Sequence, residues 1–341
     1  MELTPRKQAI LAAIVKYHIA TGAPVGSKWL TTTLENAPSS ATLRNEMSEL
    51  SSMGFLTQPH TSAGRIPTGK GYEFYVSNLM QTDEIQDREK QYIDKVLEEA
   101  SVDTENIRKV AAKVLSHLTG LVTFEGRIAS EDAVIKKVQI NLLSPRLIMM
   151  VIITDDGSTK SILIKSGSAF SESMLSILQD TAKKSVEGKC FKELTFATMQ
   201  NIYASLCINA LEVMPTIANL FDMINEMAQP EIEFFGETNI YSMLMNSEKA
   251  AQLLMFLRDK DAIMQIVSEK CDKKGVIFGA DTVYKELENA TLIVAPFGDT
   301  GRIGVIGPTR MSYGHIVSLT NYLATKLNEV LDKNIKDLEE I

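Results

Sequence analysis

The chain has 341 residues, of which 45% are hydrophobic, and it carries a formal net charge of −8. This length predicts two or three domains, and the composition is typical of a soluble globular protein. No secretory signal opens the sequence, and no apolar run reaches the roughly 18 residues of a membrane span, so we expect no membrane partner. The cysteines form neither a disulfide framework nor a zinc pattern, which favours a cytoplasmic location; they are Cys190, Cys207 and Cys271.

The charge is unevenly distributed along the chain. Residues 1–80 contain seven Lys and Arg against five Glu, a net charge of +2, which leaves −10 for the remaining 261 residues. A weakly basic head on an acidic body is compatible with a protein that contacts DNA at one end only. Because the head is only mildly basic, we expect DNA affinity to depend on dimerisation.

The head begins with three predicted helices, at about 4–21, 27–34 and 39–53. Gly22 is suited to end the first helix and Gly54 the third. Each predicted helix starts at a residue whose hydroxyl can accept a hydrogen bond from the first turn. These capping residues are Thr4, Ser27 and Ser39.

The third helix has an apolar stripe and an opposite polar face. Leu43, Met47 and Leu50 recur at helical spacing and are expected to be buried. On the other face, Arg suits guanine and Asn suits adenine, although exposed polar residues are also ordinary on a solvated helix. We take as candidate DNA-binding residues Ser39, Ser40, Ala41, Thr42, Arg44, Asn45 and Ser48.

A short hairpin is predicted directly after this helix. Residues 55–58 can form a strand, 60–65 a polar turn, and Ile66 begins a return strand. We expect the glycine to permit a tight turn and the arginine to reach a phosphate or the minor groove. The candidate contacts here are His60, Thr61, Ser62, Gly64 and Arg65. Three helices, a strand, a turn and a strand follow the order of a winged helix.

The rest of the chain mixes helices and strands, so we predict an α+β fold. Helices are expected at about 105–118, within 171–228, at 250–267 and at 313–331. Strands are expected at about 134–142, 147–153, 159–164, 232–235, 275–278, 291–296 and 301–306. The segment between residues 81 and 104 is charged and reads as a partly helical linker.

No catalytic chemistry is evident in the sequence, and we expect the chain not to be an enzyme. The glycines of 298–304 superficially resemble a phosphate loop, but a strand follows them, which favours a hairpin turn. The four histidines lack metal-ligand spacing, so no metal or cofactor is expected. A methionine-rich stretch, 199–264, indicates either core filling or a surface that a chaperonin can hold.

Five segments resemble the heat-inducible transcription repressor family, HrcA. They are LTPR (3–6), TGAPVGS (21–27), ATLRNEM (41–47), QPHTSAGRIPT (58–68) and GPTRMSY (307–313). They lie at both ends of the chain in the expected order, so the resemblance covers its whole length. Two departures are Ser40, where a proline is common, and the turn at 37–38; both affect how the third helix starts.

The resemblance implies a winged-helix DNA-binding domain and a GAF-like domain that is interrupted by an inserted α/β dimerisation domain. We place the winged helix at 1–80, a linker at 81–104, the GAF-like domain at 105–133 and 229–341, and the insert at 134–228. An alternative boundary would leave the hairpin at 147–164 in the GAF-like sheet. The implied function is repression of chaperone genes by a homodimer on an inverted repeat in double-stranded DNA, with activity maintained by a GroEL-type chaperonin and lost on heat stress. The alternative is a regulator gated by a small molecule in the GAF-like domain.

Overall fold

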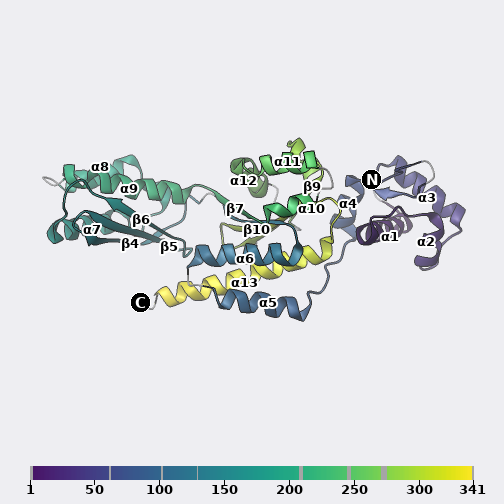
Figure 1. Cartoon of the computed structure of the whole chain (residues 1–341), viewed down its shortest axis with the longest axis horizontal. Coiled ribbons are helices and arrows are strands. Elements are labelled where there is room, and N and C mark those ends of the chain that lie inside the picture. The colour runs from purple at the N-terminus through teal and green to yellow at the C-terminus, as the bar shows by residue number, and fades with distance from the viewer. Residues whose placement is uncertain are drawn as a thin grey trace.

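The computed structural model describes residues 3–60, 63–100, 103–128, 130–206, 210–243, 247–269 and 275–339. The molecule is elongated (Figure 1), with the N-terminal helices at one end, a five-stranded sheet in the middle and a three-stranded sheet at the other end. None of the helices in these described ranges is long and apolar enough to cross a membrane.

The N-terminal end, here called the head, contains four α-helices and a small hairpin. The elements are α1 (Pro5–Thr21), α2 (Ser27–Thr33), α3 (Ser40–Ser52), β1 (Leu56–Thr57), β2 (Ile66–Pro67) and α4 (Gly69–Phe74), which continues into a π-helical turn (Tyr75–Leu79). Thr4 and Ser39 cap α1 and α3 as predicted, by accepting from the N–H groups of Lys7 and Thr42. Ser27 is not a cap: Gly26 precedes α2, and the Ser27 hydroxyl hydrogen-bonds the Ser40 hydroxyl at 2.9 Å.

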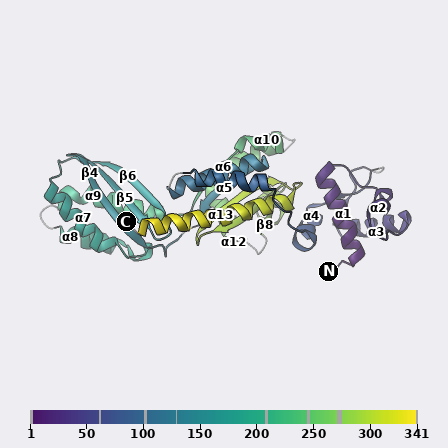
Figure 2. The same ribbon diagram turned by 90° about the horizontal axis from the view of Figure 1, so that it is seen from below.

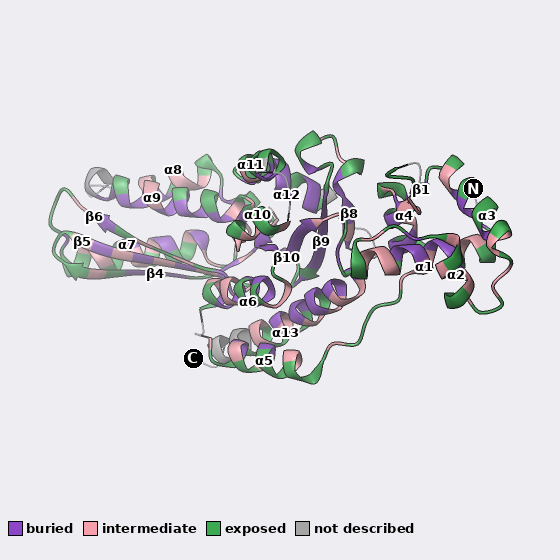
Figure 3. Ribbon diagram, turned by 45° about the vertical axis from the view of Figure 1, so that its right-hand side comes forward, coloured by how far each residue is buried: buried purple, intermediate pink, exposed green. Residues whose placement is uncertain are grey.

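The middle of the molecule, here called the body, is an antiparallel sheet between two helical layers. Its strand order is β7 (Glu231–Phe235), β3 (Val122–Arg127), β10 (Gly301–Pro308), β9 (Ala290–Phe297), β8 (Val276–Phe278). One face packs against α6 (Thr104–Thr119) and α13 (Tyr313–Glu339), beside which α5 (Asp87–Glu98) lies (Figure 2). The other face packs against α10 (Ile240–Met243), α11 (Ser247–Phe256) and α12 (Lys260–Glu269). Figure 3 shows buried residues concentrated in β9 and β10.

The three-stranded sheet lies between β3 and β7 in the chain, although these two strands are neighbours in the body. It comprises β4 (Ile135–Ser144), β5 (Leu147–Thr154) and β6 (Thr159–Lys165), and one face is covered by α7 (Glu172–Val186), α8 (Phe196–Ser205) and α9 (Ala210–Ala228). This assembly has its own hydrophobic core, whereas the core of the head is continuous with that of α6 and α13.

Three expectations about secondary structure need correction. Strand β3 was not predicted, although it lies inside the sheet and all six of its residues are buried. The helix expected at 250–267 is two helices, α11 and α12, because the Asp259 carboxylate accepts from the Ala262 N–H and starts a new helix. The last helix continues beyond residue 331, to Glu339.

Candidate nucleic-acid interface

Helix α3 presents a polar face to solvent because its apolar stripe is buried in the head. Leu43, Met47 and Leu50 all lie in the core. Ala41, Arg44, Asn45 and Ser48 are exposed on the helix, as the spacing predicted. Within the described part of the chain, the side chains of Arg44 and Asn45 make no hydrogen bond or ion pair, so both remain available to a ligand.

The first turn of α3 is held by its hydroxyl groups. The Ser39 hydroxyl accepts from the Thr42 N–H at 3.2 Å and lies 3.0 Å from the Thr42 hydroxyl. Ser40 is tied to Ser27 on α2, and the Ser48 hydroxyl donates to the Arg44 carbonyl at 3.0 Å. Ser39, Ser40 and Thr42 therefore also hold the start of the helix, which leaves Arg44 and Asn45 as the longer side chains for base edges.

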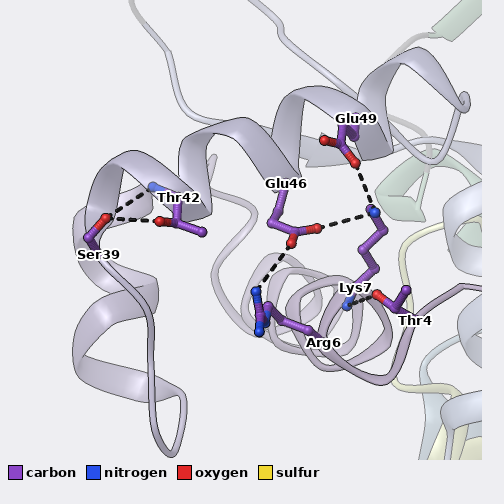
Figure 4. A network of polar contacts seen from close by, with 7 residues as sticks. All are labelled: Thr4, Arg6, Lys7, Ser39, Thr42, Glu46 and Glu49. Carbon is purple, nitrogen blue, oxygen red and sulfur yellow. Dashed lines mark hydrogen bonds and ion pairs between the residues drawn. The ribbon is translucent and has the colours of Figure 1, made fainter.

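The two acidic residues of α3 are paired with basic residues of α1 (Figure 4). Glu46 lies 3.6 Å from Arg6 and 3.4 Å from Lys7, and Lys7 lies 2.8 Å from Glu49. The close contact with Glu49 raises the pKa of Lys7, and the charge of Glu46 acts in the same direction. Surface pairs of this kind contribute little to stability. Their consequence is electrostatic, because they offset two negative charges on the helix that carries Arg44. Sequence reasoning missed this pairing.

The segment after α3 folds as a compact hairpin against the α1–α2 turn. The backbones of Val25 and Arg65 exchange two hydrogen bonds, of 2.9 and 2.8 Å, beside the β1–β2 pair. The Arg65 guanidinium donates to the side-chain oxygen of Gln58, and the Gln58 amide donates to the Ala63 carbonyl at 2.9 Å. Arg65 is therefore half-buried at the base of the turn, whereas His60 is exposed. Thr61 and Ser62 lie outside the described residues.

Gly64 is required for a different reason from the expected one. Its φ angle is not in the left-handed region, so the turn itself does not demand a glycine. A Cβ atom at this position would lie 2.2 Å from the Val25 carbonyl oxygen. The close approach of two backbones is what excludes a side chain here.

The glycine-rich segment near the C-terminus is a hairpin, as expected. Gly298, with a φ of +51°, lies in the turn that joins β9 to β10, and Gly301 begins β10. No helix follows this turn directly, so the segment lacks the helix N-terminus that binds phosphate in a nucleotide loop.

A family model described as "HrcA protein C terminal domain" matches residues 105–317. Over 99% of both chains, the protein is 31% identical to the "Heat-inducible transcription repressor HrcA" of Acetivibrio thermocellus. It is also 31% identical to the protein of that name in Clostridioides difficile, over 96% of this chain and 99% of the relative. A solved structure titled "Crystal structure of a hypothetical protein at 2.2 A resolution" is similar in fold, with a TM-score of 0.65 and 21% identity over 98% of this chain and 100% of that one.

Proposed function

The chain belongs to the HrcA family of heat-inducible transcription repressors, and from this premise we propose that it represses chaperone genes by binding an inverted repeat in double-stranded DNA as a homodimer. The observation that carries the proposal is the exposed, unpaired Arg44–Asn45 face of α3 beside a hairpin that bears Arg65. The order of α1, α2, α3, β1, β2 supports a winged helix over residues 1–80, with α3 as the recognition helix. The relatives are named as repressors, and we propose no catalytic role.

Replacing Arg44 by alanine is expected to cost about 1–3 kcal/mol of binding free energy and to relax specificity at one base pair. The reason is that a bidentate contact to guanine discriminates against other bases. The measurement is fluorescence anisotropy against the promoter duplex and duplexes with single base-pair changes. Arg258→Ala, which removes an exposed arginine from the turn between α11 and α12, is the control for net charge. A uniform loss over all duplexes would show that Arg44 contacts a phosphate.

Replacing Arg65 by alanine is expected to weaken binding to all sequences and to reduce the slope of log affinity against log salt by about one unit. On binding, the Arg65 guanidinium would leave the Gln58 side chain and contact a DNA phosphate, which would release one counterion from the DNA. Titrations at several salt concentrations measure the slope. Gln58→Ala removes the partner but keeps the charge, so its slope should equal that of the wild type. An unchanged slope in Arg65→Ala would exclude this contact.

We place the dimer contact in an inserted domain at 134–228, within a GAF-like domain at 105–133 and 229–341 that a linker at 81–104 joins to the head. Support comes from the chain leaving the body after β3 and returning in β7. The face of the three-stranded sheet opposite its helices carries Met149, Val151 and Leu163, and the Leu163 side chain is 59% exposed. An apolar sheet face of this kind is suited to a second copy of the chain.

We further propose that a GroEL-type chaperonin maintains the active repressor and that heat stress causes the repressor to lose its activity. In the methionine-rich stretch, Met223, Met227 and Met264 fill cores, but Met255 on α11 is 72% exposed. Phe196 on α8, outside that stretch, is also exposed. A loss of about 1–2 kcal/mol in stability would change active abundance several-fold. Mild heating should therefore lower the DNA-competent fraction, and chaperonin with ATP should raise it. A heat-stable fraction that ignores chaperonin but responds to a small molecule would favour ligand gating.

A further inference from the structure

The GPTRMSY segment makes a contact between the two ends of the sequence. Arg310, in the loop between β10 and α13, donates from Nη1 to the Ile19 carbonyl at 3.1 Å. Ile19 lies in the last turn of α1, which ends at the left-handed Gly22. The carbonyls of a last turn lack partners within the helix and carry its partial negative charge. A guanidinium at this place therefore complements the end of α1.

Buried aromatic side chains continue this contact beneath the loop. The Tyr72 hydroxyl, on α4 of the head, lies 2.6 Å from His18 Nδ1 on α1. The Tyr72 ring packs against Tyr313 at the start of α13, with centroids 6.1 Å apart, and both tyrosines are buried. The Tyr313 hydroxyl donates to the Thr309 carbonyl at 2.6 Å. The residue that packs on the head thus also fixes the loop that carries Arg310.

The segment that leaves the head, residues 83–94, also contacts α13. The Ser318 hydroxyl donates to the Asp83 carbonyl at 2.7 Å, His315 lies 3.2 Å from Glu89, and the Tyr322 hydroxyl donates to Asp94 at 2.9 Å. Asp83 also fits closely over Gly314, where a Cβ would lie 2.8 Å from its carboxylate. The first turns of α13 are therefore in contact with the head through Tyr313 and with the segment that leaves the head.

We propose that Arg310 is a positioning residue that fixes the head against the body and so sets the half-site spacing that the dimer accepts. The inference rests on the proposed function, because two heads on one symmetric dimer must match two half-sites on the duplex. Arg310 contacts the end of α1 and not the exposed face of α3. Its loss should therefore leave each head able to bind a half-site and remove only the fixed distance between the heads.

The test compares inverted repeats that differ only in the number of base pairs between the half-sites, together with a single half-site. The wild type should lose about 100-fold or more in affinity when the spacing is changed, since both heads can no longer bind at once. For Arg310→Ala the difference between spacings should fall below about tenfold, with the single half-site bound as by the wild type. Arg310→Lys should behave as an intermediate, and Arg258→Ala, which removes an exposed arginine between α11 and α12, as the wild type. Because Arg310 is exposed, the variant should remain folded.

A DNA-independent readout separates this inference from the proposed function. In amide hydrogen exchange, Arg310→Ala should speed exchange in the last turn of α1 and in α4, with α3 unchanged. If the variant keeps the wild-type spacing preference, or loses half-site affinity by the same factor as full-repeat affinity, the positioning role is wrong. Unchanged exchange at α1 and α4 would also overturn it. If the wild type binds no inverted repeat, the proposed function fails, and the exchange result still decides whether Arg310 holds the head.

Discussion

Replacing Arg108 by alanine is expected to destabilise the body by about 3–5 kcal/mol, the typical cost of breaking a buried ion pair by removing one partner. Arg108 on α6 donates from Nε to the Glu125 carboxylate on β3 at 3.2 Å. The two side chains are only 11% and 5% exposed. Burial raises the pKa of Glu125 to about 7, and the charge of Arg108 opposes that rise. Without Arg108 the carboxylate must either remain charged and buried or take up a proton.

The cost of Arg108→Ala should therefore depend on pH with a definite sign. A raised pKa means that the folded state binds the proton more tightly than the unfolded state does. The contribution of Glu125 to the free energy of unfolding therefore falls as the pH rises from about 4.5 to about 7. The variant, with a still higher pKa, continues to lose stability above pH 7. Urea unfolding followed by far-ultraviolet circular dichroism should show a larger deficit at pH 8 than at pH 6. Adding Glu125→Gln to Arg108→Ala should recover much of the lost stability at pH 8. A small loss of stability that does not depend on pH would contradict the role of the buried ion pair.

Replacing Gly64 by alanine is expected to displace the hairpin that contains β1 and β2, and so to weaken DNA binding. The new Cβ would lie 2.2 Å from the Val25 carbonyl oxygen and 2.9 Å from the Gly26 nitrogen, and backbone atoms cannot move aside as side chains do. The two hydrogen bonds between Val25 and Arg65 would break. At about 0.5–1.5 kcal/mol each, their loss costs the head roughly 1–3 kcal/mol.

The matched control for Gly64→Ala is Gly69→Ala, in the same head. A Cβ at Gly69 would meet nothing within 4 Å, and alanine favours a helix over glycine. Anisotropy titrations and amide exchange at Val25 and Arg65 should distinguish the two variants: the first should bind weakly and exchange quickly, and the second should match the wild type. Equal behaviour of both variants would mean that the hairpin does not need its contact with Val25.

Local signals in the sequence predicted the starts of α1 and α3. A capping hydroxyl accepts a hydrogen bond from the backbone N–H only three residues later, so the signal and its effect lie close together in the chain. Ser39 and Thr42 show this directly. Strand β3 escaped prediction because Glu125 and Arg127 interrupt its apolar run, and burial on both faces removes the alternation of a strand. The partner that makes Glu125 tolerable inside the sheet, Arg108, lies on another element. The break between α11 and α12 did have a signal, in the capping carboxylate of Asp259.

The features of the candidate site also divide into those that the sequence predicted and those that depend on packing between distant segments. The buried stripe of α3 and the exposure of Arg44 follow from helical spacing alone, and the sequence predicted both. The pairing of Glu46 with Arg6, and the approach of Gly64 to Val25, depend on how α1 and the hairpin pack against their neighbours. The contact of Arg310 with Ile19 joins residues 291 apart in sequence, beyond the reach of any local pattern.

The most direct test of the central claim is the affinity of the full chain for two duplexes of equal length at one salt concentration. One carries the inverted repeat upstream of the chaperone gene in the same genome, and the other has one half of that repeat scrambled. Since each mismatched base pair costs about 1–3 kcal/mol, the whole repeat should bind at least about 100-fold more tightly, with two chains per duplex. Equal affinities, with one chain bound to each duplex, would contradict a dimeric repressor that reads both halves of its operator.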